Sequence, residues 1–192
     1  MFQPLRTAAL MLLTLTLLTG GVYPLVVTAI AQLMFPNQAN GSIILNKEQQ
    51  VGSSLIGQSF TSPRYFWSRL SATSVMPYNA AASSGSNYGP MHPALMETAT
   101  ARITALASAG SSGIAVPVDL ITSSGSGLDP HISPAAAELQ VDRVATARQI
   151  SVEDVRRLVM QHTEGRTFGV LGEPRVNVLL LNMSLDQLSD KE

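Results

Sequence analysis

The longest apolar run of the chain lies at its amino-terminal end. Thr7 to Phe35 is almost entirely apolar, and no charged residue occurs between Arg6 and Lys47. About 20 apolar residues in a helix cross the roughly 30 Å hydrocarbon layer of a membrane, and this run is longer than that. The pattern therefore predicts one transmembrane anchor over residues 1–35.

A cleaved signal peptide is the competing interpretation of this run. Ala8 to Leu18 would be its apolar core, and Ala29-Ile30-Ala31 resembles a cleavage site. However, Leu25 to Phe35 is as apolar as the first half, whereas a cleavage region is usually short and polar. Small or helix-breaking residues in the middle favour packing against partner helices instead: Gly20, Gly21 and Pro24. We favour an uncleaved anchor, with release after Ala31 as the alternative.

The charge at the start of the run predicts its orientation. Arg6 and the amino terminus are the only nearby positive groups, and such groups stay on the cytoplasmic side. Residues 36–192 are then exported. Because the chain has no cysteine, an exported domain must rely on packing alone, which fits a bacterial envelope. We expect a single-pass protein of the bacterial inner membrane with a periplasmic carboxy-terminal domain.

Helical periodicity recurs three times beyond the anchor. Pro93 to Leu106 carries apolar residues at helical spacing. Ser133 followed by Pro134 is a helix start, with a hydroxyl cap before a proline, and this helix continues to about Gln149. Ser151 and Asp154 have the spacing of a capping box and begin another helix. These patterns predict three helices in the exported domain.

Strand patterns alternate with these helices. Ser42 to Leu45 is a candidate strand, and Ile114 to Leu120 alternates apolar and other residues despite Pro117. Val176 to Leu181 is an apolar run interrupted only by Asn177, and we interpret it as a strand buried on both faces. Tyr65-Phe66-Trp67 is the densest aromatic cluster, which we expect in the core. The sequence predicts an α+β fold, with one N-terminal transmembrane helix and one extracytoplasmic domain.

Composition excludes several classes of function. The formal net charge is −1 and no basic block occurs, so nucleic acid is not an expected partner. The absence of cysteine excludes thiol nucleophiles and Cys-ligated metals. The histidines His92, His131 and His162 are far apart and lack metal-ligand spacing, so we expect no metal site. Opposite charges around two turns, Glu164 to Arg166 and Glu173 to Arg175, predict local ion pairs.

The best candidate site is the Ser/Gly loop from Ser123 to His131. A loop of this kind between a strand and a helix can turn backbone N–H groups toward an anion, but it lacks the Lys and the spacing of a P-loop. Three interpretations remain open: a structural turn that caps the helix, a loop that faces an ion or a partner, and a hydrolytic triad. The triad would use Ser126, Asp129 and His131 and would make the chain an envelope hydrolase. We favour no catalytic residue.

Long motifs in the second half of the chain resemble one family. These are SSGSGLDPHISP at 123–134, the helix with QVDRVA at 140–145, and GEPRVNVL at 172–179. The chain is similar over essentially its whole length to the C subunit of the bacterial Kdp potassium-transporting ATPase. The similarity includes GSSLIGQSF at 52–60 and Gly85-Ser86-Asn87.

The resemblance implies a non-catalytic accessory subunit of a membrane complex. Its partners would be a channel-like subunit that takes up potassium and a P-type ATPase subunit that hydrolyses ATP, besides membrane lipid. Its role would be to support assembly and, as a catalytic chaperone, to raise the ATP affinity of the hydrolysing subunit. ATP and potassium would act through the complex, with no cofactor bound directly. The positions that we expect to face a partner or ligand are Ser86, Asn87, Ser123, Gly125, Ser126, Gly127, Asp129, His131, Gln140 and Arg143.

The predicted orientation of the anchor conflicts with direct contact between this chain and ATP. An anchor whose amino terminus is cytoplasmic places all these residues outside, where ATP is not supplied. We therefore expect any effect on ATP affinity to be indirect, through coupling between distant sites.

Overall fold

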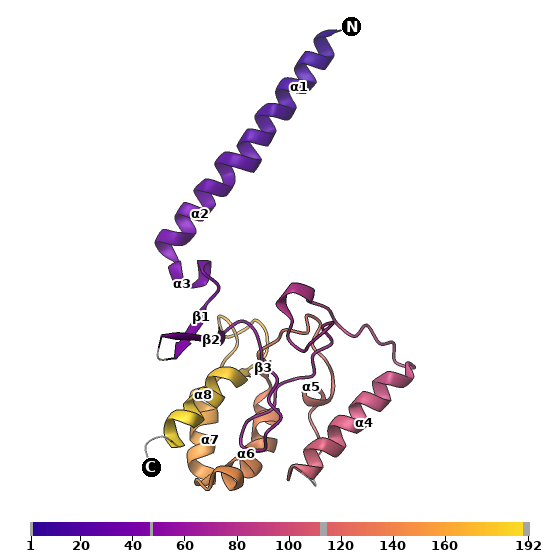
Figure 1. The fold of residues 1–192 in the computed structure, drawn as a ribbon, viewed down its shortest axis with the longest axis vertical. Coiled ribbons are helices and arrows are strands. Elements are labelled where there is room, and N and C mark those ends of the chain that lie inside the picture. The colour runs from indigo at the N-terminus through magenta and orange to yellow at the C-terminus, as the bar shows by residue number, and fades with distance from the viewer. Residues whose placement is uncertain (1, 47, 112–114, 190–192) are drawn as a thin grey trace. The chain divides into compact units, whose positions relative to one another are not determined.

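The computed structural model of the chain describes residues 2–46, 48–111 and 115–189 (Figure 1). Contacts between residues divide it into two units, one that ends at Val51 and one that begins at Gly52. The first unit is dominated by a long helix, and the second contains helices and short strands. This confirms the predicted α+β class with one N-terminal apolar helix.

The first unit contains the predicted anchor. Helices α1 (Phe2–Leu17) and α2 (Tyr23–Met34) are joined by a π-helical turn, η1 (Leu18–Val22). From Gln3 to Met34 the helix is 32 residues long and apolar enough to cross a membrane. At 1.5 Å per residue it extends roughly 48 Å, more than the hydrocarbon layer requires.

The π-helical turn lies where the sequence weakens the helix. The Tyr23 amide bonds to the carbonyl of Leu18, five residues back, and Pro24 follows with no amide hydrogen to donate. Gly20 and Gly21 lie inside this turn, and a side-chain carbon added at either one would meet no atom within 4 Å. Turns of this type interrupt helices mostly at functional positions. The helix therefore carries an open notch at the two glycines.

Three short elements follow the helix. They are α3 (Pro36–Ala39), β1 (Ile43–Asn46) and β2 (Gln49–Ser53), and the two strands form a two-stranded sheet. Strand β1 confirms the strand expected at Ser42 to Leu45.

The second unit is built from five α-helices, a 3-10 turn and a three-stranded antiparallel sheet in its described part. The helices are α4 (Pro93–Ser108), α5 (Val118–Ile121), α6 (Pro134–Arg148), α7 (Val152–Gln161) and α8 (Val178–Ser189), and the turn is η2 (Ala80–Ala82). Strands β3 (His131–Ile132), β4 (Thr163–Glu164) and β5 (Arg175–Asn177) form the sheet in the order β3-β5-β4. Helix α7 packs against both α6 and α8, whereas α4 packs against α5 (Figure 1).

Two of the three predicted helices begin at the expected caps. The Ser133 hydroxyl accepts from the Ala136 amide at 3.1 Å, and the Ser151 hydroxyl accepts from the Asp154 amide at 3.0 Å. At the start of α4, Nδ1 of His92 accepts from the Ala94 amide at 3.2 Å. Each bond satisfies an amide that the first helical turn leaves unpaired.

Two predicted strands are wrong. Residues 114–120 do not form one: Ile114 lies outside the described residues, and Val118–Ile121 is the short helix α5. Asp119 in its first turn accepts hydrogen bonds from the Ser133 amide at 2.7 Å and from the Ser133 hydroxyl at 3.2 Å. These bonds anchor α5 to the start of α6, and they outweigh the strand-like alternation.

The run from Val176 to Leu181 changes structure after two residues. Strand β5 ends at Asn177, whose Oδ1 accepts from the Leu180 amide at 3.1 Å. That bond caps the first turn of α8, so the apolar residues after it belong to a helix. The prediction of burial holds, because Val176 and Leu181 are both fully buried.

The predicted aromatic core is confirmed. Phe66 is fully buried and Trp67 nearly so, within a cluster formed with α4 to α8. They belong to residues 63–68, which contain no assigned strand and which we call the aromatic segment. Two buried side chains, Gln140 of α6 and Asn182 of α8, pair with its backbone in place of a neighbouring strand.

These two side chains, which we call the amide pair, bind consecutive residues. Gln140 Oε1 accepts from the Trp67 amide at 2.7 Å, and its Nε2 donates to the Trp67 carbonyl at 3.3 Å. Asn182 makes the same two bonds with Phe66, at 2.9 and 3.0 Å. The buried backbone groups of the segment are thereby satisfied, as burial requires.

Candidate functional site

Two Ser/Gly loops that are far apart in sequence lie against each other. The Ser84 amide and the Ser83 hydroxyl both donate to the Ser126 carbonyl, at 2.9 and 3.0 Å. The hydroxyls of Ser86 and Ser123 lie 3.0 Å apart. We call residues 83–87 and 123–127 the paired loops.

Glycine is required at two positions of the paired loops. A side-chain carbon at Gly85 would lie 2.9 Å from the Gly125 carbonyl oxygen, and one at Gly127 would lie 2.6 Å from that of Ser84. Gly127 also has a φ of 69°, a conformation that favours glycine. The loops therefore approach backbone to backbone.

The loop at residues 123–127 is also hydrogen-bonded to residues 70 and 71. The Ser71 hydroxyl donates to the Gly127 carbonyl at 2.7 Å, and the Ser124 amide donates to the Leu70 carbonyl at 3.3 Å. These bonds attach the loop to residues 70 and 71, and its turn brings Asp129 toward Arg69.

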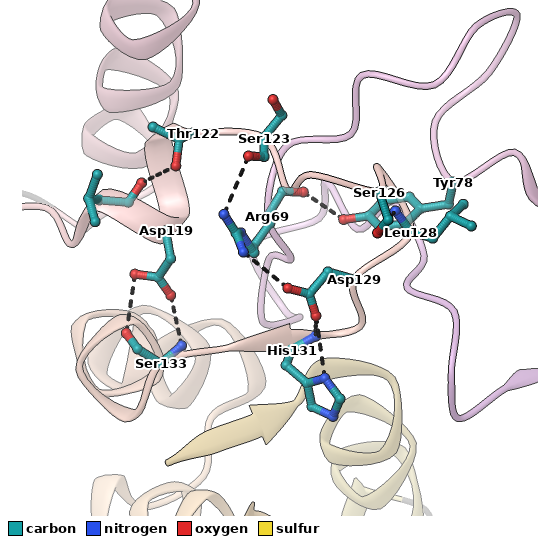
Figure 2. A network of polar contacts seen from close by, with 11 residues as sticks. Arg69, Tyr78, Asp119, Thr122, Ser123, Ser126, Leu128, Asp129, His131 and Ser133 are labelled. Carbon is teal, nitrogen blue, oxygen red and sulfur yellow. Dashed lines mark hydrogen bonds and ion pairs between the residues drawn. The ribbon is translucent and has the colours of Figure 1, made fainter. Parts of the chain in front are cut away.

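Arg69, Asp129 and His131 form a polar network beside the loops (Figure 2). Arg69 Nη1 donates to Asp129 Oδ2 at 3.0 Å, and its Nη2 donates to the Ser123 carbonyl at 3.3 Å. Asp129 Oδ1 accepts from the His131 amide at 3.0 Å and lies 3.3 Å from His131 Nδ1. The two side chains that bracket Pro130 therefore meet, although the sequence did not require it.

The network favours the charged form of Asp129. Burial alone opposes that form, but hydrogen bonds from His131 and then Arg69 outweigh it and lower the pKa of Asp129 below its ordinary 3.8. The carboxylate is thus an ionised structural group whose two oxygens are both engaged.

The arrangement does not assemble a hydrolytic triad. The Ser126 hydroxyl accepts from the Leu128 amide at 3.1 Å, and it shares no described hydrogen bond with His131. Figure 2 shows Ser126 beside Leu128, whereas the His131 ring is joined to Asp129. A triad needs the nucleophile within hydrogen-bond reach of its base. The structure therefore offers no support for the hydrolase interpretation.

The other expected site residues divide into exposed and buried positions. Asn87 is exposed at the end of its loop, with a φ of 51°. Gln140 is 0% exposed and Arg143 is 4% exposed. Arg143 donates to the carbonyls of Pro63 and Tyr65, at 2.6 and 3.0 Å. Gln140 and Arg143 therefore hold the aromatic segment and do not present a surface.

The predicted local ion pairs are present and cross between the two turns. Arg166 bonds to Glu173 at 2.7 Å, and Arg175 bonds to Glu164 at 2.7 Å. They hold the segment that joins β4 to β5. Within the part of the chain that the structure describes, no group of three or more His, Cys, Asp or Glu side chains is placed to hold a metal ion.

Sequence reasoning missed several residues that organise the site. Arg69 and Asp119 both bind residues at least 14 positions away in the chain. Neither residue belongs to a local motif, so the sequence offered no signal of their roles beyond their charge. Arg102 of α4 is a further such residue, and its guanidinium lies 4.9 Å from the centre of the Trp67 ring.

Comparison with known proteins gives a consistent result over nearly the full length. Residues 5–187 match the model of the KdpC family, described as the c chain of K+-transporting ATPase. The chain is 62% identical over 184 residues to the potassium-transporting ATPase KdpC subunit of Herpetosiphon aurantiacus, which covers 95% of each chain. It is 60% identical over 187 residues to the protein of that name in Sorangium cellulosum, with 97% of this chain and 98% of the relative covered. It is 56% identical over 186 residues to that of Dechloromonas aromatica, with 96% and 97% covered.

Proposed function

The chain belongs to the KdpC family and is a subunit of a potassium-transporting ATPase complex, and from this membership we propose that it acts there as a non-catalytic accessory subunit. The observation that carries the proposal is the match to relatives of that name over nearly the whole chain. Its partners in this proposal are a channel-like subunit that binds potassium and a subunit that hydrolyses ATP.

The polar network supports a non-catalytic role. Both oxygens of Asp129 are engaged by Arg69 and His131, and the Ser126 hydroxyl is turned toward its own loop. The chemistry of the complex would then lie in other subunits.

The apolar helix supports a role in assembly. None of the apolar window of this helix is buried in this chain, and the π-helical turn leaves a notch at Gly20 and Gly21. Small residues let a second helix approach closely within a membrane. We propose that a helix of a partner subunit packs at this notch.

Helix docking can be separated from membrane attachment. Deletion of residues 1–35 should abolish co-purification with the other subunits. Replacement of the same residues by an unrelated membrane-spanning helix should restore attachment without restoring assembly. The double change Gly20→Leu and Gly21→Leu should weaken assembly, whereas Ala8→Leu in the same helix should not. Full assembly with the unrelated helix would reject the docking.

The predicted orientation places the second unit in the periplasm. Arg6 at the start of an otherwise uncharged run supports a cytoplasmic amino terminus. A tag fused to Glu192 should be accessible to protease from outside spheroplasts, and sequencing of the mature amino terminus should recover residues before Gln32. A tag accessible only from the cytoplasm would reverse the topology.

The paired loops support a position near the potassium entrance. They offer hydroxyls and backbone carbonyls, and residues 83–87 and 123–127 contain no charged side chain. Such groups suit a surface near a dehydrating potassium ion. Combined replacement of Asn87 and Ser126 by alanine should raise the KM for potassium of the assembled complex and leave co-purification unchanged. An unaltered KM would exclude this role.

An effect on ATP affinity fits an indirect route. Gln140 and Arg143 are buried in the core, so neither offers a surface to a nucleotide. We propose that the subunit raises the ATP affinity of its hydrolysing partner by coupling between distant sites. The KM for ATP should rise when the subunit is omitted from the reconstituted complex, and the isolated chain should show no saturable binding of an ATP analogue. The same KM with and without the chain would overturn the coupling.

A further inference from the structure

A cavity of about 540 Å³ is lined by α4, by residues 121–123 at the end of α5, and by the segments at residues 70–72 and 86–88. Its walls are mostly apolar, with Leu70, Leu95 and Ile121 among the lining residues. Most ligand sites are concave and apolar with a few fixed polar groups. Ser86 and Ser123 of the paired loops also line the cavity, which takes no part in the assembly and ATP proposals.

One charged side chain lines this cavity among the described residues, that of Arg102. Its Nε donates to the Leu120 carbonyl at 3.2 Å, and its Nη2 donates to the Ser68 carbonyl at 2.7 Å. One part of the guanidinium is also covered by the Trp67 ring, 4.9 Å away. The cation is thus held in place by neutral groups, and no described carboxylate pairs with it.

A donor of Arg102 remains available to a ligand. Its Nη1 makes no described hydrogen bond and is not among the buried unpaired atoms, so it keeps access to solvent. Burial lowers the pKa of Arg102 below its ordinary value, and the opposing electrostatic effect of Tyr78 is smaller. A guanidinium in this position binds carboxylates well, because its donors match their geometry.

Three hydroxyls of the cavity wall donate to carbonyls of their own or a neighbouring segment, and the Ser123 hydroxyl donates to that of Ser86 at 3.0 Å. Those of Thr98 and Thr122 donate to the carbonyls of Ala94 and Val118, each at 2.7 Å, and that of Ser71 donates to the Gly127 carbonyl at 2.7 Å. These groups offer lone pairs only. The Ser86 and Tyr88 hydroxyls keep protons to donate, but among the described lining residues only Arg102 offers a cationic donor.

We propose that this cavity binds a carboxylate group attached to an apolar body, with Arg102 as the anion-binding group. The carboxylate can belong to a small free acid or to an acidic side chain of a partner subunit. Both ligands would bind through a carboxylate. A free acid would leave the site open in the assembled complex, whereas a partner side chain would fill it.

The test uses para-fluorobenzoate as the probe and para-fluorobenzamide as its neutral match. Fluorine NMR titrations of the full-length chain in detergent micelles, with empty micelles as the blank, give both dissociation constants. We expect the carboxylate to bind at least about tenfold more tightly than the amide, because charge-assisted hydrogen bonds are the stronger ones. Arg102→Lys should keep this preference and Arg102→Gln should abolish it.

A second pair of variants keeps Arg102 and changes the space beside it. Ala101→Leu places a larger side chain on the cavity wall and should remove binding of both probes. Ala107→Leu, at an exposed position of the same helix outside the cavity, should leave binding unchanged. This pair decides the question if Arg102→Gln fails to fold. No binding of para-fluorobenzoate, equal affinity for the two probes, or unchanged binding in Ala101→Leu would each overturn the proposal.

The assembled complex distinguishes the two sources. If the probe binds the isolated chain but not the complex, an acidic side chain of a partner subunit occupies the cavity. If it binds both, the natural ligand is a free carboxylate. Either result supports the carboxylate site, and neither depends on the proposed coupling to ATP.

Discussion

The side chain of Asn182 and the backbone of Phe66 exchange two hydrogen bonds. The Phe66 amide donates to Asn182 Oδ1 at 2.9 Å, and Asn182 Nδ2 donates to the Phe66 carbonyl at 3.0 Å. Residues of antiparallel strands pair through the same two bonds. A single side chain of α8 thus takes the place of a strand beside the aromatic segment.

Replacement of this side chain should be costly. Asn182→Leu leaves the buried amide and carbonyl of Phe66 without partners, and we expect a loss of roughly 2–4 kcal/mol in the free energy of unfolding. Urea unfolding followed by the fluorescence of Trp67, the one tryptophan, measures this at the neighbouring residue. Gln187→Leu on the exposed side of the same helix is the control and should change little. Equal losses in both variants would contradict the role of Asn182.

The glycines of the second Ser/Gly loop should differ in tolerance. Gly127→Ala forces a side-chain carbon to within 2.6 Å of the Ser84 carbonyl and requires a positive φ, so the paired loops must separate. Gly125→Ala meets no atom within 4 Å. We expect Gly127→Ala to lower the free energy of unfolding by roughly 1–3 kcal/mol, as strained backbone positions do. Thermal unfolding of the two variants compares them, and similar melting temperatures would disprove the close approach.

His162 should make stability depend on pH. Its Nε2 lies 2.9 Å from the Ser184 hydroxyl, and burial lowers the pKa of His162 below its ordinary 6.5. Between the ordinary and the lowered pKa the unfolded chain binds more protons than the folded one. The free energy of unfolding should therefore fall as the pH drops below about 6.5 and level off once the folded pKa is passed. Urea unfolding across this range should give a flatter profile for His162→Gln, and an unchanged profile would remove His162 as the cause.

The two arginines that pair across helices should differ in importance. The Arg148 side chain is 1% exposed and donates to the Arg64 carbonyl and to Asp186, each at 2.7 Å. Arg148→Met should cost roughly 2–3 kcal/mol in the free energy of unfolding, because buried acceptors lose their donor. Arg156 pairs with Glu138 at the surface, where water screens the charges, and Arg156→Met should leave stability nearly unchanged. Denaturant titration of both variants measures the two losses in the free energy of unfolding. A larger loss for Arg156→Met than for Arg148→Met would contradict the prediction.

The sequence was sufficient for elements with local signals. Hydroxyl caps at Ser133 and Ser151 mark helix starts, because a cap and the amide that it satisfies are three residues apart. The aromatic cluster at residues 65–67 was correctly placed in the core, since large rings bury wherever they can. The apolar run of the amino-terminal helix is equally local.

The two incorrect strands show where local patterns fail. The apolar run from Val176 to Leu181 suits a buried strand or a buried helix equally well. The cap at Asn177 decides between them, and it was overlooked because it lies inside the run. For residues 114–120 the decisive contact is between Asp119 and Ser133, which no window of neighbouring residues contains.

The contacts of the candidate loop could not be predicted from the sequence. The loop from Ser123 to His131 is a tight polar turn as expected, yet its principal partner is Arg69, 60 residues away from Asp129. Gln140 and Arg143 were chosen from a resemblance and lie in the core, because their roles depend on the distant aromatic segment. Long-range pairing of this kind leaves no trace in spacing.

The amide pair also sets the order in which the second unit can become protected from solvent. The acceptors for the amides of Trp67 and Phe66 lie 73 and 116 residues away in the chain. These two protons are shielded only after α6 and α8 have both formed and come together, and contacts of such sequence separation close slowly. Their deuterium exchange in the native state would thus proceed through opening of the entire unit, which makes two neighbouring amides a gauge of its global stability.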